Sequence, residues 1–372
     1  MRITESTRIA IALACTAGAA HAQSVQQLEG FTGANARAYG INDSGQIVGQ
    51  ADASTGFERA VTWERGVIRD LGSVFGASSS SVANAINNNG EIVGGSVDAT
   101  FSATATRWNS GGITDIGADM RVGGPSLAWA INDFGQVAGQ ASFSGGFSTG
   151  FFWDAKQGGG EMGTPSASNG GANMGINNSA TMVGHSFFFG DPNNATMALP
   201  GKTAGTYDAF TLEPSGRALS IARAINNNGM IVGHTNNGTG PWQAAVFTPD
   251  EKSAYYSLGT LAGLDTSEAL GLNDNGMVVG YAWDGQSTGL DPRAWAWNGS
   301  TMFDLNSLLD PKSNFEVLLQ ATGVNNNGDI VGFGRLYNGE VRSFVINGFV
   351  PAPGAAFALL GGIGAFGARR RR

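Results

Sequence analysis

Two groups of residues in this 372-residue chain have the types and spacing to do chemistry. The first is a recurring Asn-Asp/Asn-x-Gly motif, whose side-chain oxygens are of the kind that surround Ca²⁺. Most copies carry Asn at both positions, and no distal Glu recurs to complete a cage. We therefore interpret the motif as a hairpin turn, because Asn bonds to nearby backbone and Gly supplies a positive φ. The turn residues are Asn42, Gly45, Asn87, Gly90, Asn132, Gly135, Asn226, Gly229, Asn273, Gly276, Asn325 and Gly328.

The second group is the titratable residues. His185 and His234 each follow Val-Gly, at a position where other copies of the motif carry Gln, Gly, Tyr or Phe, which indicates a packing or rim position. Glycoside cleavage would need two facing carboxylates. The acids outside the motif, Glu161, Asp191, Asp208, Asp265 and Asp291, form no such signature. No nucleophile elbow or phosphate loop is found. We expect no enzymatic activity, no metal and no cofactor; a secreted glycosidase or lyase is the alternative.

Aromatic and Arg side chains are the candidates for ligand contact, since these types dominate binding energy. Tyr39, Trp129 and Arg223 occupy a position of the repeat that varies freely, for which blade-to-blade packing is the alternative role. Trp242 lies outside the recurring Trp position, and Phe187, Phe188 and Phe189 form an apolar run in the longest departure from the repeat. Trp63, Trp108, Trp153 and Trp297 recur at one position, which indicates packing inside the repeat.

The elements that position these residues form a seven-fold repeat. Phrases such as Ile41-Asn-Asp-Ser-Gly-Gln-Ile-Val-Gly49 begin at Ile41, Ile86, Ile131, Ile176, Ile225, Leu272 and Val324, with spacings of 45, 45, 45, 49, 47 and 52 residues. A period in the forties is typical of repeat architectures. In the first unit we expect four strands, at 38–42, 46–50, 59–63 and 67–71.

Connection lengths predict how these strands are arranged. Within a unit the turns take roughly four residues, whereas the link to the next unit takes about nine, which is enough to cross a four-stranded blade. The seventh copy has only three strands, and residues 25–30 resemble a fourth strand. These features predict an all-β, seven-bladed β-propeller closed by the N-terminal strand. A β-solenoid is the alternative, but it gives no reason for this exchange of strands.

Small residues recur in the first strand of every unit. The residue before the Ile is always Gly or Ala, and the residue three before it is Ala in six of seven copies. Because side chains alternate along a strand, we expect both positions to share one face, where blades crowd together near the axis.

The two ends have the pattern of processing segments. Residues 1–22 combine Arg2 and Arg8, a short apolar run and Ala20-His21-Ala22, which is the layout of a secretory signal peptide. Residues 350–372 combine Val350-Pro351-Ala352-Pro353-Gly354, fourteen mostly apolar residues and Arg369, Arg370, Arg371 and Arg372. The apolar stretch is shorter than the ~20 residues of a full membrane span. We expect the domain itself to occupy residues 23–349.

Two resemblances follow from these motifs. The C-terminal segment resembles the PEP-CTERM signals that exosortases read in Gram-negative bacteria, although Ala352 stands where the family usually has Glu. The repeat, with Ala38 to Gly49, Arg59-Ala-Val-Thr-Trp63 and Asp70-Leu-Gly72, resembles the HAF-type extracellular repeat of bacterial surface proteins. The resemblances imply an exosortase-like sorting enzyme as a partner, transient anchoring by the tail, and a location on the outer surface or in the extracellular matrix.

Composition limits the remaining partners. The net charge is −8 and charged residues make up only 13% of the chain, which argues against binding nucleic acid through a basic face. Apolar residues make up 42%, enough for a folded core, and a single Cys excludes a disulfide scaffold. We expect a monomer that binds extracellular polysaccharide or a surface protein.

Overall fold

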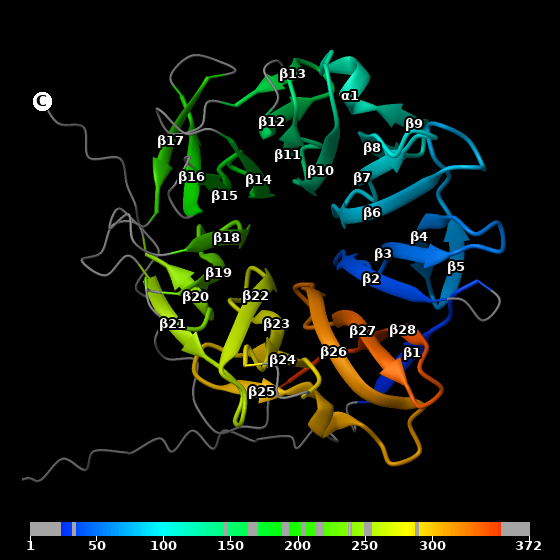
Figure 1. The fold of residues 1–372 in the computed structure, drawn as a ribbon, viewed down its shortest axis with the longest axis vertical. Coiled ribbons are helices and arrows are strands. Elements are labelled where there is room, and N and C mark those ends of the chain that lie inside the picture. The colour runs from blue at the N-terminus through cyan, green and yellow to red at the C-terminus, as the bar shows by residue number, and fades with distance from the viewer. Residues whose placement is uncertain are drawn as a thin grey trace, which may run out of the picture.

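The protein is a ring of seven four-stranded antiparallel sheets, the seven-bladed β-propeller expected from the repeat (Figure 1). This computed structural model describes residues 24–31, 35–143, 147–162, 170–187, 193–201, 206–212, 219–236, 238, 240–248, 255–286 and 290–350. The solenoid alternative is wrong, because the innermost strand of the last sheet packs beside that of the first. The expected signal peptide and the tail from Pro351 onwards lie outside the described residues. Among the described residues, no helix has the length and apolar character needed to span a bilayer.

Each blade runs from its innermost to its outermost strand in chain order, except the seventh. The bounds follow. Blade 1 has β2 (Ala36–Ile41), β3 (Ile47–Asp52), β4 (Glu58–Glu64) and β5 (Val67–Asp70); blade 2 has β6 (Ser80–Ile86), β7 (Ile92–Val97), β8 (Ala103–Asn109) and β9 (Gly112–Asp115); blade 3 has β10 (Ser126–Ile131), β11 (Val137–Ala141), β12 (Thr149–Asp154) and β13 (Gly158–Glu161); blade 4 has β14 (Gly170–Ile176), β15 (Met182–Phe187), β16 (Asn194–Pro200) and β17 (Tyr207–Thr211). Blade 5 has β18 (Ser220–Ile225), β19 (Ile231–Thr235), β20 (Gln243–Phe247) and β21 (Tyr255–Gly259); blade 6 has β22 (Thr266–Leu272), β23 (Val278–Trp283), β24 (Arg293–Trp297) and β25 (Met302–Asp304); blade 7 has β26 (Phe315–Val324), β27 (Ile330–Leu336), β28 (Val341–Ile346) and β1 (Val25–Leu28). Two single helical turns, α1 (Ile116–Asp119) and η1 (Leu305–Leu308), lie in crossovers.

The N-terminal strand completes the last blade, as the sequence predicts. β1 pairs antiparallel with β28, with Val25 opposite Ile346 and Leu28 opposite Ser343. The indole Nε1 of Trp63 in blade 1 also donates to the carbonyl of Glu29 at 2.8 Å. Strand exchange between the two ends of the domain therefore closes the ring and covers a sheet edge that would otherwise be exposed.

The small residues of the inner strands lie on opposite faces, so the expectation of a shared face is wrong. Every inner strand has a register shift between these two positions, as between Ala38 and Gly40, and the residue between them is the extra residue of a β-bulge. Ala38 packs toward blade 7 with Val331. A Cβ on Gly40 would lie 3.5 Å from the Cα of Ala85 in blade 2. Small size is needed on both faces because both meet a neighbouring blade.

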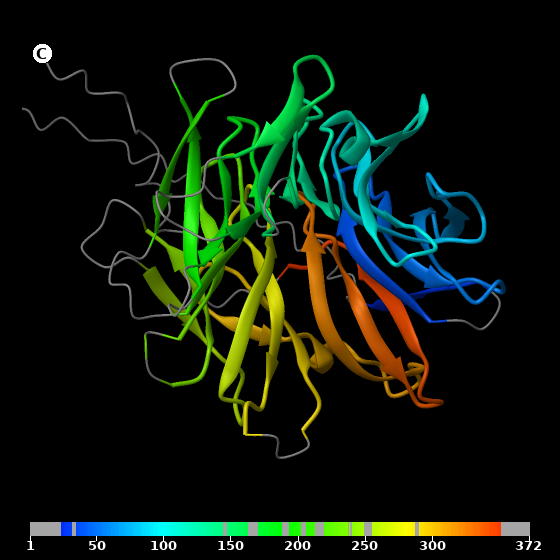
Figure 2. The same cartoon turned by 45° about the horizontal axis from the view of Figure 1, so that its top comes forward.

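The recurring Trp residues form the packing between blades. Trp63, Trp108, Trp153 and Trp297 are at most 6% exposed, which agrees with the packing role predicted for them. Trp63 packs with Leu28 and Val345 of blade 7, and Trp108 packs with Val48 of blade 1. Figure 2 shows the blades side by side around the central opening, with β22 next to β26.

The ring has two faces, which we name by the connections on them. The turn face carries the turns between the first and second strands of each blade, such as Asn42 to Gly45. The loop face carries the loops between second and third strands and the crossovers between blades. The central channel therefore has a turn-face mouth and a loop-face mouth, and the two are built from different residues.

Candidate functional site

The turn-face mouth is held by a closed ring of seven hydrogen bonds, which we call the first hydrogen-bond ring. In each repeat the turn Asn donates its Nδ2 to the backbone carbonyl of the same residue in the next repeat. The bonds run Asn42 to Asn87 (3.1 Å), Asn87 to Asn132 (2.9 Å), Asn132 to Asn177 (2.9 Å), Asn177 to Asn226 (3.2 Å), Asn226 to Asn273 (3.0 Å), Asn273 to Asn325 (2.9 Å) and Asn325 to Asn42 (3.0 Å). All seven side chains are buried.

The same amides also build their own hairpins. The Oδ1 of Asn42 accepts from the backbone N–H of Gln46 at 2.9 Å, and the equivalent bond recurs in the other six repeats. The interpretation of these residues as turn formers therefore holds, but it is incomplete. The amide accepts through its oxygen from its own turn and donates through its nitrogen to the next repeat, so an ionised Asp at this position would leave a buried carbonyl without its donor.

A second hydrogen-bond ring lies one residue further along. Here the Oδ1 of each Asp or Asn accepts the backbone N–H of the equivalent residue in the preceding repeat, at 2.8–2.9 Å. Its members are Asp43, Asn88, Asp133, Asn178, Asn227, Asp274 and Asn326. The two rings line a mouth of about 200 Å³. Because each side chain is already bonded to a neighbouring blade, we assign this mouth a structural role.

The turn-face mouth does bring two carboxylates close together. Asn326 Nδ2 donates to the Oδ2 of Asp43 at 3.0 Å and to the Oδ2 of Asp274 at 3.5 Å. Glycoside hydrolysis needs one protonated acid and one carboxylate free to act on the substrate. Both carboxylates already accept a backbone N–H and this side-chain amide. Their arrangement suits an interblade link better than acid–base chemistry.

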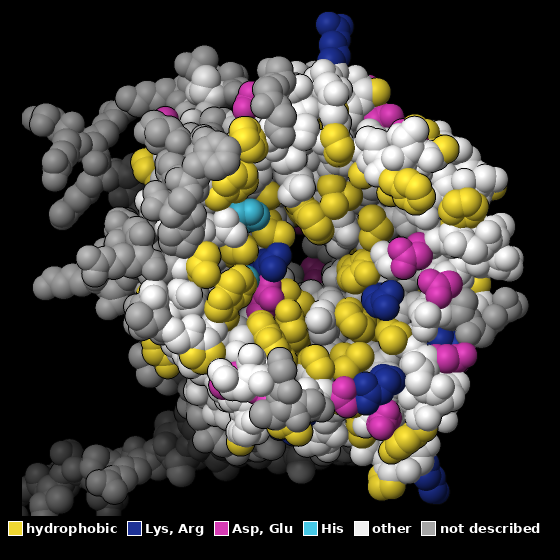
Figure 3. Space-filling model, in the orientation of Figure 1, with side chains coloured by type: hydrophobic (Ala, Val, Ile, Leu, Met, Phe, Trp, Pro, Cys, Tyr) yellow, Lys and Arg dark blue, Asp and Glu magenta, His cyan; other side chains and the backbone are white. Residues whose placement is uncertain are grey.

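The loop-face mouth is lined by two inner rows of side chains, one row four positions and one row two positions before the repeat Ile. The first row is Arg37, Val82, Leu127, Ala172, Ile221, Glu268 and Gln320, and the second is Tyr39, Asn84, Trp129, Met174, Arg223, Leu270 and Thr322. Most are half-buried and alternate with a fully buried position. In Figure 3, hydrophobic side chains surround much of the opening, and a group of basic, acidic and His side chains lies over β14, β18 and β22.

Glu268 is the centre of that polar group. Its carboxylate Oε1 accepts from Nε of Arg223 at 2.5 Å and lies 3.3 Å from Nδ1 of His234, while Oε2 accepts from the hydroxyl of Tyr281 at 3.0 Å. The side chain of Glu268 is only 5% exposed and that of His234 is fully buried. Three neighbours from blades 5 and 6 therefore surround one buried carboxylate, and two of them donate hydrogen bonds to it.

These contacts determine the protonation of the group. Burial alone would raise the pKa of Glu268, but the contact with His234 and the charge of Arg223 outweigh it and lower the pKa to about 2. Burial and the carboxylate raise the pKa of the Tyr281 hydroxyl. Glu268 is thus an anion at neutral pH with its oxygens occupied, which suits positioning of Arg223 and does not suit a general acid or base.

Aromatic rings flank the Glu268 group on the loop face. The rings of His234 and Trp242 stack with centroids 4.3 Å apart, and those of Tyr281 and Trp283 stack at 4.8 Å. Both Trp side chains are partly exposed. Flat apolar surfaces beside an oriented cation are an arrangement that can bind the face of a sugar ring and its polar substituents.

The residues predicted from sequence to contact a ligand are only partly brought together. Arg223 and Trp242 join the same group, whereas Tyr39 and Trp129 lie on inner strands of other blades around the same mouth. Phe187 instead packs against Phe147 with ring centroids 6.5 Å apart. Phe188 and Phe189 lie outside the described residues. Val350 is described and exposed, and the rest of the sorting motif is not described.

Two further members of the inner rows do make the blade-to-blade contacts considered for the variable position. Asn84 Nδ2 donates to the carbonyl of Ala128 at 2.8 Å, and Thr322 Oγ1 donates to that of Ala38 at 2.9 Å. The packing role predicted for the His position also agrees with the burial of His234.

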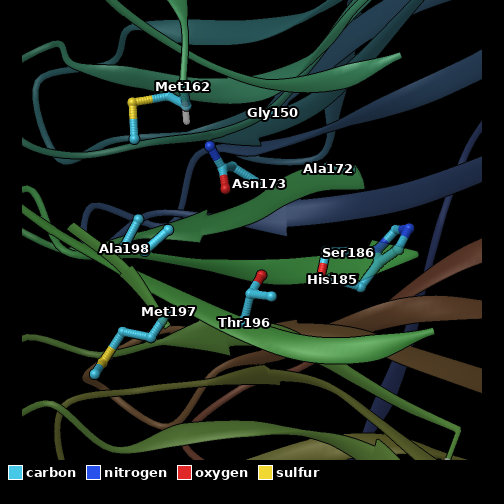
Figure 4. Close-up of a pocket in the computed structure, with 10 residues that line it drawn as sticks. Gly150, Met162, Ala172, Asn173, His185, Ser186, Thr196, Met197 and Ala198 are labelled. Atoms are coloured by element: carbon cyan, nitrogen blue, oxygen red, sulfur yellow. The ribbon is translucent and has the colours of Figure 1, made fainter. Parts of the chain in front are cut away.

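A small cavity lies beside β15. It measures about 10 Å³ and is lined by residues that include Asn173, Ser186 and Thr196. In Figure 4 the imidazole of His185 points away from Asn173 and Met162. Because a cavity of this size holds one water molecule at most, we do not consider it a ligand site.

Sequence reasoning missed Glu268, Tyr281 and Trp283. A signal was present, since Glu268 is the only acid in its row of the repeat. What could not be foreseen is that the Glu of blade 6 and the Arg of blade 5, which belong to different rows, meet across neighbouring strands.

Comparisons with known proteins support the fold but identify no family. No family model and no curated protein matches the chain. Among solved structures, it is similar to a puromycin-hydrolyzing peptidase of Mycobacterium tuberculosis, with a TM-score of 0.59 and 11% identity over 89% of this chain and 54% of that one. A puromycin hydrolase gives a TM-score of 0.51 and 13% identity, covering 86% of this chain and 55% of that one. The chain thus spans about half the length of these proteins, and the likeness shows the propeller fold alone.

Proposed function

We propose that this chain is a secreted, cell-surface-sorted, non-enzymatic propeller that binds extracellular polysaccharide through its loop-face mouth. The observation that carries the proposal is the Glu268 group: a buried carboxylate that orients Arg223 beside the partly exposed rings of Trp242 and Trp283. A rigid strand-borne site of this kind, on a ring locked by two hydrogen-bond rings, is preorganised for binding.

The non-enzymatic part of the proposal rests on the state of the carboxylates. Glu268 has its oxygens occupied by three neighbours, and Asp43 and Asp274 are bonded into the turn-face mouth. The alternative, a secreted glycosidase or lyase, would need a carboxylate that is free to meet substrate. Incubation of the purified protein with the polysaccharide should therefore release no reducing ends and no unsaturated sugars.

Secretion and sorting are proposed from the two end segments. Residues 1–22 have the layout of a signal peptide and residues 350–372 that of an exosortase signal. The seven blades are complete between Val25 and Ile346, so removal of both segments would leave every blade intact. Intact mass measurement of the protein from its host should show loss of residues 1–22 and of the Arg-rich tail. Retention of Arg369 to Arg372 in mature protein would contradict the sorting proposal.

The binding proposal is tested by co-sedimentation of the purified protein with the host's extracellular polysaccharide. We expect saturable binding that Trp242→Ala weakens, while Tyr337→Ala, an exposed aromatic on the loop face of blade 7, leaves it unchanged. Melting temperatures of both variants show whether the fold is retained. Absence of binding, with a protein captured by cross-linking on intact cells, would instead make a surface protein the partner.

A further inference from the structure

The two channel mouths differ in charge. In the second hydrogen-bond ring the charged members are Asp43, Asp133 and Asp274, and neither ring contains a cation. In the two inner rows of the loop-face mouth the charged members are Arg37, Arg223 and Glu268. Arg223 is paired with Glu268 and Arg37 lies 4.0 Å from Glu58, so these groups of the loop-face mouth sum to about zero charge, whereas the turn-face mouth is acidic.

Accessibility increases this difference. The side chain of Glu268 is 5% exposed, whereas those of Arg223 and Arg37 are 27% and 33% exposed. A ligand that enters this mouth therefore reaches the guanidinium of Arg223 more readily than the carboxylate of Glu268, whereas Arg37 lies 4.0 Å from the exposed carboxylate of Glu58. An anionic ligand is therefore repelled less at the loop face than at the turn face, where the carboxylates line the opening.

The guanidinium of Arg223 is fixed with one edge available. Its Nε donates to Glu268, and its Nη1 lies 3.4 Å from the thioether sulfur of Met174, a weak acceptor. No hydrogen bond from its Nη2 to another described residue is found. The edge formed by Nη1 and Nη2 can therefore take a planar carboxylate through two parallel hydrogen bonds. Glu268 keeps the guanidinium plane from rotating.

We propose that the polysaccharide is acidic, and that Arg223 binds the carboxylate of a uronate residue whose ring packs on Trp242 or Trp283. This inference rests on the proposed function and adds the chemical class of the polymer. A neutral sugar could use the aromatic surfaces, but it would not supply the anion that the Nη edge is oriented to receive.

The test compares polygalacturonate with its fully methyl-esterified form, which has the same sugar ring and no charge. Calorimetric titration of the full chain should show tighter binding of the acid polymer. Arg223→Gln should weaken that binding about tenfold or more, as expected for loss of a charge-assisted contact, and should weaken binding of the ester by a smaller factor. Arg223→Lys keeps the positive charge but lacks the planar pair of Nη donors. Its affinity for the acid polymer should therefore lie between those of the unmodified protein and Arg223→Gln. Arg69→Gln, an exposed Arg on the outer strand β5, is the matched control.

Each result decides the inference. Equal affinity for the acid and ester polymers, or binding of neither, would overturn it. The host's polysaccharide provides an independent check, since chemical reduction of its carboxylates should abolish binding. Binding that survives reduction overturns the uronate inference and leaves the proposed polysaccharide function intact, whereas failure to bind the unreduced polymer contradicts that function itself. If Arg223→Gln does not fold, the comparison of acid and ester with the unmodified protein still gives the answer.

Discussion

The side-chain amide of Asn325 donates a 3.0 Å hydrogen bond to the backbone carbonyl of Asn42, which lies 283 residues earlier in the chain. This bond closes the first hydrogen-bond ring and joins the seventh repeat to the first. It acts at the inner edge of the closure, where strand exchange between β1 and β28 acts at the outer edge. The propeller is therefore closed twice, at two different radii.

Breaking the inner closure should be costly. Asn325→Ala removes the donor to the buried carbonyl of Asn42 and the acceptor for the turn of its own repeat. We expect the free energy of unfolding to fall by about 1–3 kcal/mol. Phe134→Ser, at the exposed position of the third-repeat turn where the first repeat has Ser44, should change it by less than about 0.5 kcal/mol. Denaturant unfolding measures both, and equal effects would show that the ring contributes nothing beyond the turn.

The outer closure can be tested at Leu28. This side chain is 5% exposed and packs with Trp63 and Val345. Leu28→Ala should lower the free energy of unfolding by about 2–5 kcal/mol, the usual range for truncating a buried Leu. Gln26→Ala, on the exposed face of the same strand, should have little effect. Similar melting temperatures for the two variants would argue against β1 as a structural part of blade 7.

The turn of the fourth repeat carries a backbone strain that Gly would relieve. Ala180 has φ of 56°, at the position where Gly229 of the next repeat has φ of 81°. Left-handed backbone costs a residue with a Cβ about 1–2 kcal/mol, part of which the greater flexibility of Gly in the unfolded chain offsets. Ala180→Gly should therefore raise the free energy of unfolding by about 0.5–1 kcal/mol, and Gly229→Ala should lower it. In thermal melts, the two variants should therefore shift the melting temperature in opposite directions.

The depressed pKa of Glu268 predicts acid-dependent stability. Burial opposes ionisation, but His234 and Arg223 hold the folded-state pKa at about 2, below the ordinary 4.5. The unfolded chain therefore binds the proton first, and the stabilisation is complete above pH 4.5 and lost as the pH falls toward 2. Glu268→Gln should be less stable than the unmodified protein at pH 7, and the gap should narrow across this window. A gap that does not vary with pH would refute the pairing.

The lowered pKa of His185 predicts a second pH range in which stability changes. Burial, together with the charge of Arg223 and the nearby His234, lowers its folded-state pKa from 6.5 to about 4. Because the unfolded chain takes up this proton at higher pH, the contribution is present above pH 6.5 and lost as the pH falls to 4. His185→Gln, which places the residue of the first and third repeats at this position, should flatten the stability profile between pH 6.5 and 4. Urea midpoints at half-unit pH steps would show it.

The sequence by itself determined the number of blades, their strand order and their closure. The repeat phrase begins seven times, turns within a unit are short and links between units are long, and residues 25–30 supply the strand that the seventh unit lacks. These are local signals, because hairpin turns depend on Asn and Gly at fixed offsets and strands depend on alternation. The fourth copy, whose turn has Ala180 in place of Gly, still forms a complete four-stranded blade.

Only the tertiary structure decided what the repeated residues do. A turn Asn and an interblade donor look the same in one repeat, and the first hydrogen-bond ring exists because seven blades bring each amide to the next carbonyl. The bulge between Ala38 and Gly40 places them on opposite faces of the inner strand, each against a different neighbouring blade. Likewise, Arg223 and Glu268 are 45 residues apart and meet only across two blades. Contacts between repeats depend on the curvature of the closed ring, and no single stretch of sequence encodes that curvature.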